Sequence, residues 1–81
     1  MTTTERQQVF RNVTPTVKMI EFLEDVSING GRARAEWYLP STLNEAIDEL
    51  WVEQYTSEIS GRELVRITDR GFIKLKEYFN A

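Results

Sequence analysis

The sequence predicts a mainly α-helical α+β fold that contains one β-hairpin. Two segments, 15–25 and 41–51, repeat apolar residues at helical spacing. A third segment, 52–68, is rich in strand-forming residues on both sides of a Ser-Gly turn. The chain then changes from a strand pattern to a helical pattern within residues 64–79. The expected order is therefore helix, short helix or strand, helix, β-hairpin, helix.

Length and composition indicate one small globular domain. The chain has 81 residues, of which 41% are hydrophobic and 28% charged, with a net charge of −3, no cysteine and no histidine. These two absences remove cysteine-based metal sites, the commonest metal ligand and the commonest general base. We therefore expect neither enzyme activity nor a cofactor. The sequence shows no run of 18 apolar residues and no signal-peptide pattern, so we expect a cytoplasmic protein that does not enter a membrane.

The first long helix is expected from Pro15 to Asp25, with Thr14 as its N-cap. Proline suits the first helical position because its missing N–H needs no partner there. Val17, Ile20 and Leu23 then recur at helical spacing and predict the buried face.

The next segment leaves two interpretations open. Asn29-Gly30-Gly31 predicts a turn. The following stretch, "RARAEWYL", alternates at its start and has helical spacing at its end, which fits either a short helix or an irregular strand. Trp37, Tyr38 and Leu39 are expected to be buried, and Pro40 is expected to end the segment.

The second long helix is expected from Ser41 to Trp51. Thr42 and Glu45 have the spacing of a capping box, which predicts the start of the helix. Apolar residues at i, i+3, i+4, i+7 and i+8 predict one buried face, formed by Leu43, Ala46, Ile47, Leu50 and Trp51. The opposite face is polar and acidic, with Asn44, Glu45, Asp48 and Glu49.

The hairpin leaves its register open between two loops. A two-residue loop would oppose Glu58 to Glu63, whereas a three-residue loop with Gly61 in the left-handed conformation would oppose Glu58 to Arg62. We favour the three-residue loop because it avoids a pair of like charges. The buried face of the hairpin is expected to carry Val65 and Ile67.

The last helix begins with a glycine that needs an explanation. Thr68 is the expected N-cap, and Asp69 suits the positive end of the helix. Gly71 in the first turn costs about 1 kcal/mol relative to alanine, so we expect it to allow close packing against a neighbouring element. Most of the aromatic residues are expected in the core, namely Trp37, Tyr38, Trp51, Phe72 and Phe79.

The element order, and above all the stretch "LVRITDRGFIKLKEYF", resembles the winged-helix domain of small archaeal and bacterial transcription regulators. In such domains the second strand of the wing often reads apolar-x-Leu/Ile-Thr-x-x-Gly and is followed by a helix with a central leucine. Those places are held here by Ile67, Thr68, Gly71 and Leu75. The resemblance implies a winged-helix domain over residues 14–81, preceded by a partly frayed extension over residues 1–13.

The resemblance also implies a DNA-binding transcription regulator that contacts double-stranded DNA through its helix-turn-helix and wing, as a homodimer. If the domain dimerises, the two ends that carry Val9, Phe10, Tyr78 and Phe79 are expected to meet at the dimer contact. The alternative is that these ends pack within one chain. The implied nucleic-acid-binding residues are Arg32, Arg34, Ser41, Thr42, Asn44, Glu45, Arg62 and Arg66. Among them, Asn44 is suited to reading adenine and Glu45 to accepting from cytosine N4.

The charge pattern supports an alternative function. Residues 41–58 carry five acidic side chains and no Lys or Arg, so the helix expected in the major groove would bring unpaired carboxylates toward phosphates. The alternative is a winged-helix module that binds a basic protein partner of the transcription or replication machinery through Asp48 and Glu49.

Overall fold

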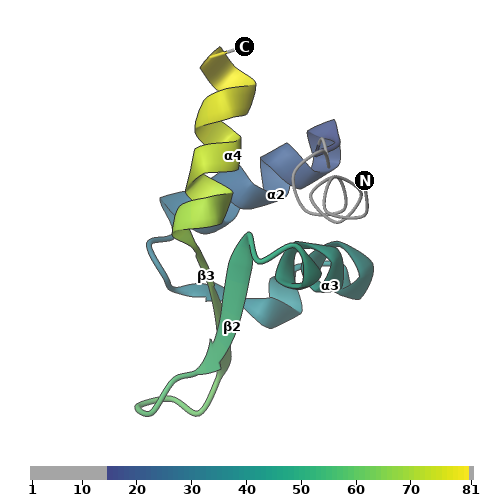
Figure 1. Cartoon of the computed structure of the whole chain (residues 1–81). Helices are drawn as coiled ribbons and strands as arrows, with labels where there is room; N and C mark the ends of the chain where they lie inside the picture. The colour runs from purple at the N-terminus through teal and green to yellow at the C-terminus, as the bar shows by residue number, and fades with distance from the viewer. Residues whose placement is uncertain (1–14, 81) are drawn as a thin grey trace, which may run out of the picture.

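The computed structural model describes residues 15–80. The elements follow the order α2 (Val17–Ile28), β1 (Ala33–Arg34), the 3-10 turn η1 (Ala35–Trp37), α3 (Pro40–Asp48), β2 (Val52–Thr56), β3 (Glu63–Ile67) and α4 (Asp69–Asn80). Over this range the fold has three α-helices and one antiparallel sheet with the strand order β1-β3-β2, and the hairpin extends away from the helices (Figure 1). The expected α+β class is confirmed, and the arrangement is compatible with a winged helix.

Helix α2 starts and ends later than expected. Its N-cap is Thr16, whose hydroxyl oxygen accepts the backbone N–H of Met19 at 3.2 Å. The expected cap, Thr14, lies outside the described residues. The helix continues to Ile28 rather than ending at Asp25, because fully buried Val26 extends its apolar face into the core.

The segment after α2 contains both of the structures that the sequence left open. Ala33–Arg34 pairs with β3 as a short strand, and the 3-10 turn follows it directly. Trp37 and Leu39 are exposed, so their expected burial was wrong. Tyr38 is half-buried, because its ring packs edge-on against Phe22 at 4.8 Å and its hydroxyl donates to Asp25 at 2.6 Å.

Helix α3 begins at Pro40, and the expected capping box was wrong. The N-cap is Leu39, which has no side-chain acceptor, and Thr42 is already the third helical residue. Proline can start the helix earlier than expected because it needs no partner for an N–H.

The end of α3 also differs from the expectation. The helix ends at Asp48, and Leu50 adopts a left-handed conformation with φ 63°. The N–H of Leu50 bonds to Ile47 O and that of Trp51 bonds to Ala46 O, which together form a Schellman closure. Leu50 therefore turns outward and is exposed, while Trp51 returns to the core and is fully buried.

The hairpin has a longer loop than expected, and the favoured register was wrong. Thr56 pairs with Glu63, and the Ser57 N–H donates to Arg62 O at 2.8 Å, which leaves a loop of residues 58–61. The expected left-handed conformation of Gly61 is confirmed by its φ of 73°. Glu63 avoids a like-charge pair in another way, because it lies opposite the hydroxyl of Thr56 and accepts a hydrogen bond from it.

The start of α4 confirms the expected cap and the close packing at Gly71. The Thr68 hydroxyl oxygen accepts the Gly71 N–H at 3.0 Å. The same hydroxyl donates to Leu50 O at 2.6 Å, and the Thr68 N–H donates to Trp51 O at 3.0 Å. A Cβ atom on Gly71 would lie 2.1 Å from Trp51 O, so only glycine fits this crossing of α4 over the end of α3.

The core lies between the inner face of the sheet and the three helices. Its largest fully buried side chains are Trp51, Leu23, Val26, Val52 and Val65. From α4 only Gly71 and Leu75 are buried, so the expected core positions of Phe72 and Phe79 were wrong. Beyond its first turns, α4 projects away from the sheet (Figure 1). None of the helices in residues 15–80 combines the length and the apolarity that crossing a membrane requires.

Candidate nucleic-acid interface

The strand pairing places arginine side chains on the outer face of the sheet. Val65 is buried against the helices, so Leu64 and Arg66 point to the opposite side. Arg34 pairs with Leu64 and shares this outer face. Arg32 precedes the same short strand and is exposed. Strand pairing therefore brings Arg34 and Arg66, which are distant in sequence, onto one surface.

Two of these arginines contact aromatic rings. The Arg66 guanidinium lies 4.6 Å from the ring centre of Tyr55 and donates to the carboxylate of Glu53, the residue opposite it on β2. The Arg34 guanidinium lies 5.8 Å from the ring centre of Trp37. These contacts hold both side chains over the sheet, and Glu53 compensates part of the charge of Arg66.

Two further arginines have no ion-pair partner within residues 15–80. They are Arg32, before β1, and Arg62, at the exposed tip of the hairpin. The hairpin tip is held by hydrogen bonds from Gly61 N–H to Ser57 O at 2.8 Å and from Ser60 N–H to the Ser57 hydroxyl at 3.3 Å. We use the name arginine face for the surface made by Arg32, Arg34, Arg62 and Arg66.

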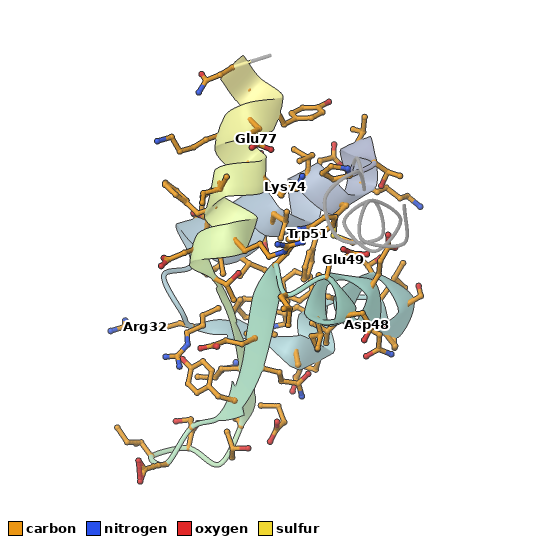
Figure 2. All side chains as sticks on the ribbon, viewed as in Figure 1. Arg32, Asp48, Glu49, Trp51, Lys74 and Glu77 are labelled. Atoms are coloured by element: carbon orange, nitrogen blue, oxygen red, sulfur yellow. The ribbon has the colours of Figure 1, made fainter. Side chains whose placement is uncertain are left out.

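Helix α3 presents a different surface. Ser41, Asn44, Glu45 and Asp48 are exposed at i, i+3, i+4 and i+7, whereas Thr42 is half-buried. In the described part of the chain, neither Glu45 nor Asp48 forms an ion pair. Figure 2 shows Arg32 and Asp48 on opposite sides of the β2–β3 ribbon. The structure thus separates the expected nucleic-acid-binding residues into an arginine group and an α3 group.

The junction between α3 and α4 keeps one arginine away from this surface. The Arg70 Nε donates to the carbonyl oxygen of Glu49 at 2.9 Å, at the C-terminal end of α3. A cation at this position stabilises the negative end of the helix dipole. Arg70 therefore supports the fold at the end of α3.

Sequence reasoning missed two residues that shape the arginine face. Trp37 was assigned to the core, but it is exposed and lies beside Arg34. Glu53 was not considered, although it binds Arg66. The correct hairpin register would have revealed the Glu53–Arg66 pair, because these two residues are opposite each other on neighbouring strands.

Two groups outside the arginine face have shifted pKa values. Hydrogen bonds from the Thr56 hydroxyl and then from the Gln54 amide lower the pKa of the Glu63 carboxyl. Burial, reinforced by the hydrogen bond to Asp25, raises the pKa of the Tyr38 hydroxyl. Residues 15–80 contain no group of three or more carboxylates arranged to hold a metal ion.

Comparisons of the chain with protein-family models, with curated proteins and with solved structures found no match.

Proposed function

We propose that the protein is a DNA-binding winged-helix transcription regulator that contacts double-stranded DNA through its wing and its arginine face. The observation that carries this proposal is the strand pairing, which gathers Arg34 and Arg66 on one outer face beside Arg32. Arg62, which directly precedes β3 at the tip of the hairpin, is exposed and adds a further cation to the wing.

Phosphate neutralisation is the chemistry that this surface supports. Binding of Lys and Arg side chains to phosphates releases counterions and supplies most of the sequence-independent affinity for DNA. Arg32, Arg34 and Arg62 are the first candidates, because none of them has an ion-pair partner among residues 15–80. Arg66 joins them only when its guanidinium exchanges Glu53 for a phosphate, so it contributes less.

Helix α3 has a limited part in this proposal. Ser41 and Asn44 are of residue types that suit contacts to the backbone and to a base edge, but they share one exposed face of the helix with Glu45 and Asp48. Its C-terminal half carries Asp48, which would repel phosphates if the whole helix lay in the major groove. We therefore place DNA on the arginine face and the wing, with the acidic part of α3 turned aside.

The test is a fluorescence-anisotropy titration of mixed-sequence duplex DNA at about 50 mM and about 200 mM salt. We expect micromolar binding at the lower salt concentration and a loss of affinity by orders of magnitude at the higher one. The double variant Arg32→Ala/Arg34→Ala and the single variant Arg62→Ala should each bind more weakly. Removal of one arginine–phosphate contact should reduce the slope of log K against log salt by about 1.

The control is Lys18→Ala, which removes one exposed cation from α2, outside the arginine face. It should leave the affinity and the salt slope almost unchanged. Glu53→Gln should increase the affinity, because it releases Arg66 from its partner. No binding at low salt by the folded protein would refute the proposal, and equal reductions of affinity in the Lys18 and Arg62 variants would refute the assignment of the surface.

One observation favours a second candidate function, a protein-interaction module for a basic partner. Glu45 and Asp48 are exposed on one face of α3 and form no ion pair within residues 15–80. Reversal of charge in the variant Asp48→Lys/Glu49→Lys should abolish binding of such a partner. A DNA-binding protein should tolerate the same reversal or bind DNA more tightly.

A homodimer is also part of the proposal, since a dimer would read a short palindrome with two copies of the same surface.

A further inference from the structure

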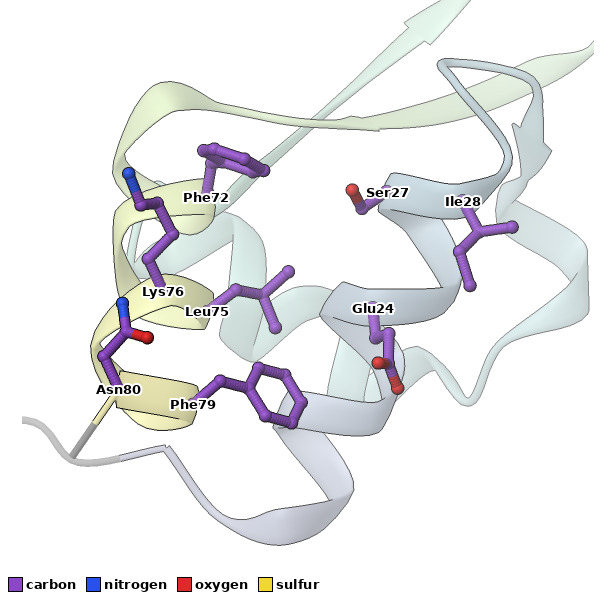
Figure 3. A pocket seen from close by; sticks show the side chains of 8 residues that line it. All are labelled: Glu24, Ser27, Ile28, Phe72, Leu75, Lys76, Phe79 and Asn80. Carbon is purple, nitrogen blue, oxygen red and sulfur yellow. The ribbon is translucent and has the colours of Figure 1, made fainter.

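Exposed aromatic side chains lie in two regions of residues 15–80, on α4 and in the 3-10 turn η1. On α4 they border a groove of about 430 Å³ toward α2, where Figure 3 shows Leu75 and Phe79 extending from α4. One acidic and one basic side chain line this groove, so its charge favours no particular ligand. In η1 the exposed ring is Trp37, which lies beside Arg34 at the border of the arginine face.

The indole of Trp37 is an open aromatic surface. It is 52% exposed, and the Arg34 guanidinium lies 5.8 Å from its centre, close to the limit of about 6 Å for a cation–π contact. The Tyr38 ring is inclined at 72° to it, with the ring centres 6.3 Å apart, and therefore does not stack on it. A planar ligand can reach the indole without displacing a close contact.

The other ring that an arginine contacts on the outer face of the sheet is held more tightly. Tyr55 is half-buried opposite Leu64, and the Arg66 guanidinium lies 4.6 Å from its ring centre. Its hydroxyl donates to the carbonyl oxygen of Gly31. Trp37 is therefore the ring beside the arginine face that is available to a ligand.

We propose that a single strand of DNA crosses the arginine face with one unpaired base stacked on Trp37. Sites for single-stranded nucleic acid combine cations along the backbone with aromatic rings on which bases stack. Inside a duplex the neighbouring base pairs cover both faces of each base, so only an unpaired base can offer a face to the indole. The inference rests on the arginine face of the proposed function and adds single-stranded DNA as its ligand.

The charges around Trp37 determine the path of the strand. Trp37 also borders a hollow of about 320 Å³, whose lining carries Glu21, Asp25 and one cation, Lys18, but not Arg34. The two carboxylates would repel a phosphate there, whereas a base is uncharged. The backbone must therefore run over Arg34, which has no ion-pair partner among residues 15–80, and only the base reaches the indole.

Tryptophan fluorescence tests this contact directly. The chain has two tryptophans, and Trp51 is fully buried, so a stacked base should quench the emission of Trp37 alone. We expect quenching at about 50 mM salt by an oligothymidylate of about 12 nucleotides, within the roughly 4–16 nucleotides that single-strand sites cover. A duplex of about 30 base pairs, whose ends are few, should bind without this quenching.

Substitutions of Trp37 separate stacking from simple apolar contact, with affinity measured by anisotropy of a labelled oligothymidylate. Trp37→Phe keeps an aromatic ring and should bind within about threefold of the wild type. Trp37→Leu keeps apolar surface only and should bind about 5- to 150-fold more weakly, the range for loss of one stacking ring. Because Trp37 is exposed, both variants should keep the circular dichroism spectrum of the wild type.

The salt dependence separates the ring from the arginine beside it. Trp37→Leu removes no phosphate contact, so it should leave the slope of log K against log salt unchanged. Arg34→Ala should reduce the slope by about 0.7, the value for one phosphate of a single strand. If Trp37 served only to hold Arg34 in place, both variants would reduce the slope.

The matched control is Leu39→Ala, which removes an exposed apolar side chain two positions from Trp37. It should leave the affinity and the quenching almost unchanged. An oligothymidylate that binds without quenching, or a Trp37→Leu variant that binds as tightly as the wild type, overturns the inference. Duplex binding without single-strand binding refutes only this inference, whereas single-strand binding with quenching, in a protein that binds no duplex, refutes only the proposed function.

Discussion

Substitution of Gly71 by alanine tests the packing at the start of α4, because steric and helix-propensity effects have opposite signs. A Cβ atom at this position would lie 2.1 Å from Trp51 O and 2.9 Å from a side-chain carbon of Ile67. Ordinary van der Waals contact begins at 3.4 Å, so the first of these distances is too short by more than 1 Å. The clash involves a backbone carbonyl group, and α4 must therefore move relative to the end of α3.

Three hydrogen bonds connect α4 to the end of α3 and limit that movement. Thr68 N–H donates to Trp51 O at 3.0 Å, the Thr68 hydroxyl donates to Leu50 O at 2.6 Å, and Arg70 Nε donates to Glu49 O at 2.9 Å. A shift of about 1 Å weakens at least one or two of them, at about 1 kcal/mol each. Overpacking adds about 1–3 kcal/mol, and the better helix propensity of alanine offsets about 1 kcal/mol. We expect Gly71→Ala to lower the free energy of unfolding by about 1–4 kcal/mol.

Urea denaturation followed by tryptophan fluorescence provides the measurement, because Trp51 is fully buried and reports on this junction. The control is Gly61→Ala, where open space surrounds the site and only the φ of 73° opposes alanine. That variant should be less stable by about 1 kcal/mol. If Gly71→Ala were as stable as the wild type or more stable, helix propensity would dominate and the close contact with Trp51 would be refuted.

Three further predictions concern single side chains. Leu50→Gly should raise the free energy of unfolding by up to about 1 kcal/mol in thermal denaturation, because glycine adopts the left-handed conformation without strain, and a decrease would refute that strain. Thr68→Val should lower the free energy of unfolding by about 1–2 kcal/mol, because it removes the cap. Thr68→Ser keeps the hydroxyl and should retain most of the stability of the wild type. Because the pKa of the Glu63 carboxyl is lowered in the folded protein, its ionised form stabilises the fold at pH values above the ordinary pKa of a glutamate. This contribution is lost as the pH falls through the lowered pKa. Carboxyl titration by NMR should show that Thr56→Val moves the pKa of Glu63 upward, and an unchanged pKa would exclude the hydrogen bond as its cause.

The sequence predicted the parts of the fold that depend on local chemistry. Thr68 was identified as a cap because hydroxyl side chains accept backbone N–H groups at helix starts, and the structure confirms it. Gly71 was identified as a close-packing glycine because no local advantage explains glycine in a first helical turn. Leu43, Ala46 and Trp51 were correctly assigned to the core from their spacing.

The parts that depend on contacts distant in sequence were not predictable in the same way. Leu50 has the spacing of a buried helical residue, but it is exposed because the helix ends before it in a Schellman closure. Phe72 and Phe79 form an apolar stripe, and a stripe does not show whether its partner belongs to the same chain. Sequence reasoning placed both rings in the core and also considered Phe79 for a dimer contact, so it left the partner of this stripe undecided.

The candidate site illustrates the same difference. Each arginine of the arginine face was named from the sequence, but their common location follows from strand pairing. The favoured loop placed Glu58 opposite Arg62, and that register would not have paired Glu53 with Arg66. The contact that moderates the charge of Arg66 became visible only with the correct register.

The placement of Arg32 and of Asp48 on opposite sides of the β2–β3 ribbon (Figure 2) predicts how DNA binding should depend on salt. The shortest dimension of the molecule is 20 Å. Charges are screened over about 10 Å at 0.1 M salt and over about 30 Å at 0.01 M. Near 0.1 M, DNA on the arginine face should therefore be insensitive to Glu45 and Asp48, and the net charge of −3 does not prevent binding.

At lower salt the carboxylates of Glu45 and Asp48 should repel DNA that is bound on the arginine face, because their field then extends across the domain. We expect the plot of log K against log salt to be linear above about 0.05 M and to flatten toward 0.01 M. The variant Glu45→Gln/Asp48→Asn should restore the straight line at low salt and leave the affinity near 0.1 M almost unchanged. If the variant instead changed the affinity equally at all salt concentrations, the carboxylates would lie within the DNA interface. Helix α3 would then face the DNA, and the proposed placement of DNA on the arginine face would be wrong.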